Sequence, residues 1–378
     1  MNLPNKYRKR ALVRIVLLVL ITFSMIVLAS WANKPFILAV LGQSKNSGNE
    51  PSPVVVQKQQ GDSDRTFADW CREKASLKPE VKYSVEVLLN KAGTTECDTA
   101  NQTLLSFFNL ELENNQIRDV KPLASLTNLI QLGLANNQIS DIKPLASLTK
   151  LGLLGLRRNQ ISNIKPLESL INLITLGLAN NQIRDVKPLK SLTNLGWLNL
   201  KNNQISDIKS LESLSKLYSL TLENNQIRDI KPLESLTDLT NLYLDDNQIS
   251  DIKSLASLTS LHLLTLKNNQ IRDIKPLESL TYLTSLNLEN NQISDIKPLE
   301  SLTRMYWLTL ANNQISDIKP LASLTYLTSL NLENNQISDI KPLASLTNLS
   351  ELYLSGNPIT PKTCPFKQES ICHWKPLN

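Results

Sequence analysis

The stretch from Leu129 to Leu148, LIQLGLANNQISDIKPLASL, recurs with small changes through most of this chain. Its Asn137 has an equivalent every 22 residues, and the series comprises Asn115, Asn137, Asn159, Asn181, Asn203, Asn225, Asn247, Asn269, Asn291, Asn313, Asn335 and Asn357. A fixed period of this length is typical of stacked repeats, in which each unit packs only on its neighbours. The 378-residue chain is therefore expected to form one long repeat domain rather than several globular domains.

The apolar positions of the stretch predict the path of each repeat. Leu132 and Leu134 flank Gly133, and this alternation indicates a short strand whose leucines face inward. The segment after Asn137 carries Pro144, which suits the first turn of a short helix or 3₁₀ segment. We predict an α/β repeat solenoid with the fold of a leucine-rich repeat horseshoe. It has a parallel sheet on the concave side, short 3₁₀, helical or irregular segments on the convex side, and a small helical N-terminal cap.

The recurring asparagine is predicted to hold the repeats together. It lies beside apolar positions, and a buried amide is costly unless it is hydrogen-bonded. Its side chain can both donate and accept, so a ladder of amides can bond the backbone in the turns that leave the strands. We therefore assign a structural role to Asn137, Asn203, Asn247 and their equivalents. A row of ligand-binding asparagines is the alternative.

Five segments make up the predicted domain organisation. They are a signal peptide or membrane anchor (1–41), a flexible linker (42–65), a helical cap (66–106), twelve leucine-rich repeats (107–360) and a C-terminal cap (361–378). Residues 15–33 are uncharged and apolar, so they either stay in a membrane or are removed by cleavage near Ala32. Because Lys and Arg precede them, either outcome leaves the remainder outside the cytoplasm.

The four cysteines lie in two pairs outside the repeats, Cys71 with Cys97 and Cys364 with Cys372. Bridges between the two caps would bring Cα atoms from opposite ends of the solenoid to about 6 Å, which its length forbids. We therefore predict the two local disulfides, as expected for an oxidising compartment. Two pairs of buried free thiols are the alternative, if the protein is not exported.

The segment 126–147, LTNLIQLGLANNQISDIKPLAS, and its copies resemble the 22-residue leucine-rich repeats of bacterial internalins. This resemblance covers the repeats only. It implies a curved solenoid that binds a partner on its concave sheet, but it does not imply which partner, because the contact residues of that family follow no common motif.

Charge and motif content exclude several function classes. The formal charge is +6, but five of the basic residues lie within residues 1–32, so the rest of the chain is nearly neutral. Outward strand positions carry more acids (Glu111, Glu113, Glu223, Asp245, Asp246, Glu289, Glu333 and Glu351) than bases (Arg157, Arg158, Lys201 and Lys267), which argues against nucleic acid. The chain has two histidines and no metal-binding, phosphate-binding or nucleophile motif. We predict no catalytic activity, cofactor or metal.

Candidate partner-binding residues are charged or aromatic side chains on the concave face, since binding hot spots are rich in Trp, Tyr and Arg. They are Arg157, Arg158, Trp197, Lys201, Tyr243, Asp245, Lys267 and Trp307. We predict a monomeric, exported, non-catalytic recognition or adhesion module that binds a protein partner on this face. The alternative is a binder of cell-envelope or extracellular carbohydrate that stacks sugars on Trp197, Tyr243 and Trp307. Tolerated surface drift would also account for these aromatic residues.

Overall fold

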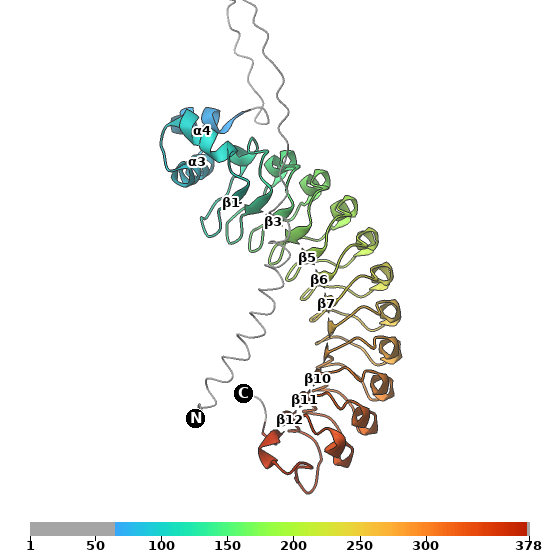
Figure 1. The fold of residues 1–378 in the computed structure, drawn as a ribbon. Helices are drawn as coiled ribbons and strands as arrows, with labels where there is room; N and C mark the ends of the chain where they lie inside the picture. Colours follow the sequence, from blue (N-terminus) through green and yellow to red (C-terminus); the bar gives the residue numbers. More distant parts are fainter. Residues whose placement is uncertain (1–64, 376–378) are drawn as a thin grey trace, which may run out of the picture. The chain divides into compact units, whose positions relative to one another are not determined.

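The computed structural model describes residues 65–375, which form a curved stack of repeats with a helical unit at its N-terminal end (Figure 1). The strands line the inner side of the curve, and the 3₁₀ helices lie on the outer side. This arrangement confirms the predicted leucine-rich repeat solenoid. The predicted signal or anchor segment, and the predicted linker up to residue 64, lie outside the described residues. Within residues 65–375, no helix is both long and apolar enough to cross a membrane.

The N-terminal unit consists of α2 (Phe67–Arg72), η2 (Lys74–Ser76), α3 (Pro79–Ala92) and α4 (Cys97–Leu105). Thr66 and Asp69 form a capping box at the start of α2, and the hydrogen bonds from Thr66 hold the pKa of Asp69 below its usual value. Proline occupies the first position of α3, and Gly93 ends that helix in the left-handed conformation with φ of 69°. Local sequence signals therefore set both ends of α3.

One sheet of thirteen parallel strands runs through the array in sequence order. Consecutive repeat strands pair residues 22 apart, so that Leu132 of β2 lies between Leu110 and Leu154. The strands are β1 (Asn109–Glu111), β2 (Gln131–Gly133), β3 (Leu153–Gly155), β4 (Thr175–Gly177), β5 (Trp197–Asn199), β6 (Ser219–Thr221), β7 (Asn241–Tyr243), β8 (Leu263–Thr265), β9 (Ser285–Asn287), β10 (Trp307–Thr309), β11 (Ser329–Asn331), β12 (Glu351–Tyr353) and β13 (Cys372–His373).

Each convex segment begins with a 3₁₀ helix at the Lys-Pro or Lys-Ser pair. The preceding aspartate fixes its start, as when the Lys143 N–H donates to Asp141 Oδ1 at 2.8 Å. The helices are η3 (Lys121–Leu123), η4 (Lys143–Ser147), η5 (Lys165–Ser169), η6 (Lys187–Ser191), η7 (Lys209–Ser213), η8 (Lys231–Ser235), η9 (Lys253–Ser257), η10 (Lys275–Ser279), η11 (Lys297–Ser301), η12 (Lys319–Ser323) and η13 (Lys341–Ser345). The recurring serine also links neighbours, since Ser147 Oγ donates to the Ala124 carbonyl at 2.7 Å.

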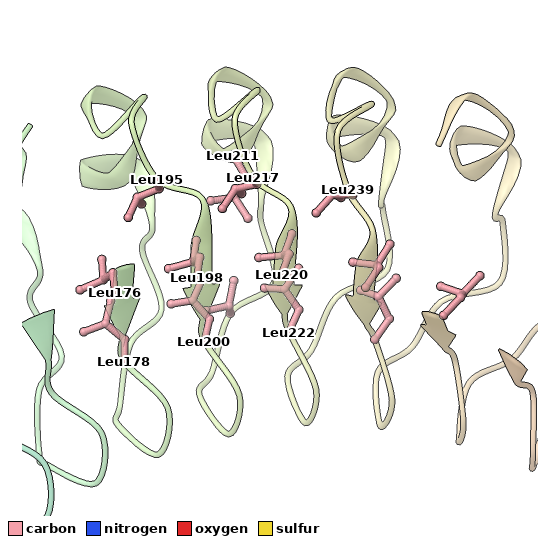
Figure 2. Close-up of a cluster of buried hydrophobic side chains, with 14 of the residues drawn as sticks. Leu176, Leu178, Leu195, Leu198, Leu200, Leu211, Leu217, Leu220, Leu222 and Leu239 are labelled. Atoms are coloured by element: carbon pink, nitrogen blue, oxygen red, sulfur yellow. The ribbon is translucent and has the colours of Figure 1, made fainter. Parts of the chain in front are cut away.

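The core is a continuous column of leucine and isoleucine side chains between the sheet and the 3₁₀ helices. Figure 2 shows Leu198, Leu200, Leu220 and Leu222 stacked from one repeat to the next, and none of them has exposed surface. The column extends from Phe67 in the N-terminal unit to the C-terminal segment. Each repeat therefore buries its apolar face only by contact with its neighbours.

The recurring asparagine bonds two adjacent repeats. Asn203 Oδ1 accepts the Ile183 N–H at 3.0 Å, and Asn203 Nδ2 donates to the carbonyls of Leu178 and Leu200 at 3.1 and 3.0 Å. Asn137 and Asn247 make the same set of contacts. These side chains are only 8–9% exposed. Each amide thus satisfies backbone groups that no strand or helix pairs.

The two disulfides have the predicted pairing, with Cα distances of 5.5 Å for Cys71–Cys97 and 5.8 Å for Cys364–Cys372. After η14 (Glu369–Ile371), the C-terminal segment returns to the sheet as β13 and pairs with β12. His373 stacks on Tyr353 with ring centroids 4.6 Å apart. The outward side of the last repeat is therefore covered by the chain itself.

Candidate functional site

Large side chains on the concave face gather on β5 to β8 and on the residues that directly follow these strands. We call this group the concave centre and define it as Trp197, Lys201, Glu223, Tyr243, Asp245 and Lys267. In the register of the sheet, Ser219 of β6 lies beside Trp197, and Thr221 of β6 lies beside Tyr243. Ser219 and Thr221 are only 6% and 8% exposed although both face outward from the sheet. The concave centre therefore has a floor of small hydroxyl side chains with an aromatic residue on each side.

Two ion pairs between adjacent repeats flank this floor. Lys201 Nζ lies 3.1 Å from Glu223 Oε2, and Lys267 Nζ lies 2.9 Å from Glu289 Oε1. All four side chains are partly exposed, so each pair contributes little to stability. Their main effect is electrostatic, because they neutralise both lysines of the concave centre.

Asp245 lies between the two ion pairs, and among residues 65–375 no basic side chain forms a salt bridge with it. Its Oδ1 accepts the Lys267 N–H at 2.7 Å. Burial raises the pKa of Asp245 to about 6; the Lys267 N–H and the Thr265 hydroxyl oppose this increase, and the negative charges of Glu223 and Asp246 add to it. Burial, with the charge of Glu223, also raises the pKa of Tyr243. The concave centre therefore holds a carboxylate whose ionised form is less favoured than it would be in water.

Asp245→Asn is expected to stabilise the protein at pH 7.5 by about 1 kcal/mol and to leave stability unchanged at pH 4. Since the folded-state pKa of about 6 exceeds the ordinary value of 3.8, the native state binds the proton more tightly, and stability falls as pH rises between these values. A pKa shift of this size changes the free energy of unfolding by about 3 kcal/mol for a fully buried group. Solvent screening at this half-exposed carboxylate lowers the change to about 1 kcal/mol.

Urea denaturation of both proteins at the two pH values measures this difference. The matched control is Asp238→Asn, which alters an exposed carboxylate in the same repeat. The prediction fails if Asp238→Asn raises the free energy of unfolding at pH 7.5 as much as Asp245→Asn does. It also fails if Asp245→Asn is less stable than the parent at that pH.

The other predicted residues lie outside the concave centre. Arg157 and Arg158 belong to the repeat of β3, two repeats before Trp197, and both are exposed. Arg158 has φ of 55°, at a turn position where most copies have asparagine. Trp307 begins β10, three strands beyond Tyr243, and is 46% exposed. The structure thus places Trp197, Lys201, Tyr243, Asp245 and Lys267 within four successive repeats, whereas Trp307, the third aromatic residue of the carbohydrate alternative, lies three strands beyond Tyr243.

A flat strip borders the concave centre on its N-terminal side. Gly155 and Gly177 pair across β3 and β4, and the only side chain within 4 Å of a Cβ placed at either position is the ring of Trp197, next to Gly177. The indole therefore extends towards bare backbone rather than over another side chain.

At the other end of the sheet, Glu333 and Tyr353 are buried, and Glu333 accepts a hydrogen bond from Ser355 Oγ at 2.5 Å. Burial raises the pKa of Tyr353 to about 12.

Most of the exposed aromatic surface lies elsewhere, on the flank where the chain enters the strands. The large exposed hydrophobic side chains there are Phe108, Ile130, Ile171, Ile174, Tyr218, Tyr282, Tyr306 and Tyr326. None of them was predicted to be functional, because they lie outside the outward strand positions from which the partner-binding candidates come. The available signal was the run of Tyr282, Arg304 and Tyr326 in three successive repeats, at a position where the other copies have asparagine, lysine, aspartate or serine.

Comparison with known proteins places this geometry in a family. The model of the family "Leucine Rich repeats (2 copies)" matches residues 108–147, 127–169, 171–213, 193–235, 215–257, 237–279, 259–301, 303–345 and 327–363. The structure of an internalin of Listeria monocytogenes, InlF, is 38% identical with a TM-score of 0.70, and the alignment covers 73% of this chain and 82% of that one. This chain belongs to the internalin-like leucine-rich repeat proteins.

Two further structures support the assignment of the internalin-like chain. Internalin C2 of the same organism is 37% identical over 55% of this chain and 91% of that one, with a TM-score of 0.50. A leucine-rich repeat protein of Leptospira interrogans is 30% identical over 68% of this chain and 71% of that one, with a TM-score of 0.56. No curated protein sequence matches the chain.

The convex side of the internalin-like chain has two clefts of about 840 and 770 Å³, between η7 and η8 and between η10 and η11. Both are lined by the same repeated Asp, Lys, Glu and Ser side chains, and in both pairs of repeats the variable position of the Lys-Pro-Leu-x-Ser or Lys-Ser-Leu-x-Ser segment is glutamate. Both clefts therefore result from residues that recur in the repeats, and neither has a lining of its own. Within residues 65–375, no group of three or more His, Cys, Asp or Glu side chains could hold a metal ion.

Proposed function

We propose that this protein is an exported, non-catalytic recognition or adhesion module whose concave centre binds a protein partner through a basic side chain. Leucine-rich repeat proteins of this type mediate recognition between proteins. A plant peptide hormone receptor with the same fold, 21% identical with a TM-score of 0.55, has been solved in complex with RGF2. The observation that carries the proposal for this chain is the half-buried Asp245, which has no cationic partner among residues 65–375.

The surroundings of Asp245 favour a cation from outside. Glu223 and Asp246 add negative charge, and both lysines of the concave centre are engaged with other carboxylates. An arginine or lysine of a partner would supply the missing opposite charge and would lower the pKa of Asp245 towards its ordinary value. Such a charge-assisted hydrogen bond to a half-buried carboxylate is among the stronger contacts in an interface.

Trp197 and Tyr243 provide the apolar contact area. They stand on either side of the buried Ser219 and Thr221, and each keeps part of its ring accessible. Rigid aromatic side chains around a partly desolvated charge are typical of interface hot spots. The stem of a partner's arginine or lysine can pack between them while its head group reaches Asp245.

Export is supported by the two disulfides, which form and persist in oxidising compartments. The apolar segment 15–33, preceded by Lys and Arg, agrees with this placement. We propose that the repeats act outside the cytoplasm, either tethered by that segment or released after its cleavage.

The double variant Trp197→Ala with Tyr243→Ala is expected to weaken binding of the protein partner by about 100-fold or more, since two central aromatic anchors are lost. The partner is first identified by covalent cross-linking on cells that display the full chain, and its affinity is then measured by calorimetry. The matched control is Tyr218→Ala, because Tyr218 is an exposed tyrosine near the same strands but outside the concave centre.

Asp245→Asn separates charge recognition from apolar contact. It keeps the acceptor for the Lys267 N–H and removes only the negative charge, so we expect about tenfold weaker binding with a smaller dependence on salt. Equal affinity of the parent, the double variant and Asp245→Asn for the cross-linked partner would rule out the concave centre as its binding site.

A further inference from the structure

A separate cleft of about 450 Å³ lies on the flank where the chain enters β8 to β11. It is lined by His262, Tyr282, Thr284, Arg304, Tyr306 and Tyr326. His262, Thr284 and Tyr306 immediately precede β8, β9 and β10, so the cleft follows the edge of the sheet rather than its concave face. We call it the edge cleft. It shares no residue with the concave centre.

The repeat architecture does not account for the residues of the edge cleft. In four copies, an asparagine two residues before this edge position bonds the preceding repeat, as when Asn194 Nδ2 donates to the Ile171 carbonyl at 3.0 Å. Asn128, Asn172 and Asn348 make the equivalent bond. In four others the position holds Lys150, Lys216, Asp238 or Ser260. Only three successive repeats place tyrosine or arginine at this position, as Tyr282, Arg304 and Tyr326. These repeats give up a hydrogen bond between neighbours and gain an exposed aromatic and cationic surface.

Arg304 gives the edge cleft a positive charge that no neighbouring acid neutralises. Its guanidinium lies over the ring of Tyr282, 4.4 Å from the centroid. Among residues 65–375 no carboxylate forms a salt bridge with it, and no acidic residue lines the cleft. By contrast, Lys216 at the equivalent position donates to Asn194 Oδ1 at 2.7 Å. A stacked guanidinium keeps the N–H groups at its edge free to bind a carboxylate in bidentate geometry.

The aromatic side chains form tilted walls around this cation. Tyr306 and Tyr326 have ring centroids 6.2 Å apart at 55°, and His262 and Tyr282 are 6.1 Å apart at 51°. The three tyrosines are 42–56% exposed, and no residue between 65 and 375 bonds their hydroxyls. His262 Nδ1 lies 2.9 Å from the Ser260 carbonyl, which can only accept, so Nδ1 carries a proton and Nε2 remains for a ligand.

These features fit a sugar ring that carries a carboxylate. The C–H face of a pyranose packs on an aromatic ring, its hydroxyls bond phenol and imidazole groups, and its carboxylate pairs with guanidinium. An extended peptide fits less well, because β8 to β11 are paired on both sides and offer no free strand edge for its main chain. We propose that the edge cleft binds a carboxylated saccharide, such as a sialic acid or a uronic acid, through Arg304 and the three tyrosines.

Titration of the full chain followed by ligand-observed NMR tests this proposal. The probes are 3′-sialyllactose with lactose as its uncharged counterpart, and trigalacturonate with its methyl ester. We expect one or both acidic saccharides to bind and both uncharged forms to bind at least tenfold more weakly. Binding of 3′-sialyllactose would indicate a sialic acid site, and binding of trigalacturonate would indicate a uronic acid site. A similar affinity for the charged and uncharged forms would overturn the proposal.

Arg304→Gln should weaken the binding of the preferred acidic saccharide by about tenfold or more, and Tyr306→Ala by a similar factor. Lys216→Gln and Tyr218→Ala are matched controls on the same flank and should leave the affinity unchanged. If acetyl-trialanine binds as tightly as the acidic saccharides, the cleft recognises a peptide carboxylate and the proposal fails. Absence of binding by all four saccharides at 10 mM, a concentration well above the ~1 mM Kd expected of a small cleft, would also overturn it. Neither result would affect the concave centre, which shares none of these residues.

Discussion

Replacing Asn203 by alanine is expected to lower the free energy of unfolding by about 3 kcal/mol. The substitution leaves the Ile183 N–H without its acceptor and the carbonyls of Leu178 and Leu200 without their donor. These groups are buried between repeats, and each buried polar group left unpaired costs about 1–3 kcal/mol. Both neighbouring repeats are affected, because one side chain bonds the backbone of each.

Urea denaturation gives the loss of stability, and amide hydrogen exchange locates it, since the Ile183 N–H should lose protection before distant repeats do. Asn194→Ala is the matched control. Asn194 also bonds neighbouring repeats, donating to the Ile171 carbonyl and accepting from Lys216 Nζ, but at a partly exposed position, so its loss should cost less than about 1 kcal/mol. Equal losses for the two variants would mean that the buried amide adds nothing beyond a surface hydrogen bond.

The fold could be predicted from the sequence because every repeat carries the same pattern of strand and turn residues. One copy, with Leu132, Leu134 and Pro144, already contains the inward strand positions and the start of the convex segment, and eleven further copies require them to stack in the same register. Short-range physics dominates in such an array, since each residue contacts only its own repeat and the next. The same reasoning identified the local disulfides, because the solenoid separates its two ends.

The C-terminal segment could not be derived in this way. It does not repeat, so nothing in the period indicates that Cys372 and His373 return to the sheet as β13. The position of Tyr353 in its repeat is outward, yet stacking on His373 leaves it 9% exposed. The 22-residue period shows that the Tyr353 side chain faces outward from the sheet. Whether that side of the sheet is covered depends on the C-terminal segment, which does not repeat.

The candidate sites were predictable only in part for a related reason. The 22-residue period shows which slots on the concave face hold Trp197, Tyr243 and Asp245. It does not show that Lys201 and Lys267 are engaged by Glu223 and Glu289, which leaves Asp245 without a cation. The edge cleft escaped prediction because Tyr282, Arg304 and Tyr326 precede the strands, at positions where the repeat pattern specifies no direction for the side chain.

Replacing Cys71 and Cys97 together by serine is expected to destabilise the N-terminal unit by about 3.5 kcal/mol, on the chain-entropy model of a disulfide that closes a 26-residue loop. This unit covers the first repeat, where Leu110 and Leu112 are almost completely buried. Without it, the first repeat would expose its apolar cross-section to water, and unfolding should begin at that end of the array. We therefore expect the Leu112 N–H, which donates to the Gly133 carbonyl at 2.7 Å, to lose protection from hydrogen exchange.

The paired variant Cys364→Ser with Cys372→Ser provides an internal comparison at the other end of the same array. Its bridge closes a loop of only 8 residues, so the same model gives a smaller loss of about 2.5 kcal/mol. Here the Leu354 N–H, which donates to the His373 carbonyl at 2.9 Å, should exchange faster while the Leu112 N–H stays protected. Each variant should thus fray its own end. If either variant lowered protection evenly across all repeats, the array would unfold as one cooperative unit, and the disulfides would act on the whole solenoid rather than on its ends.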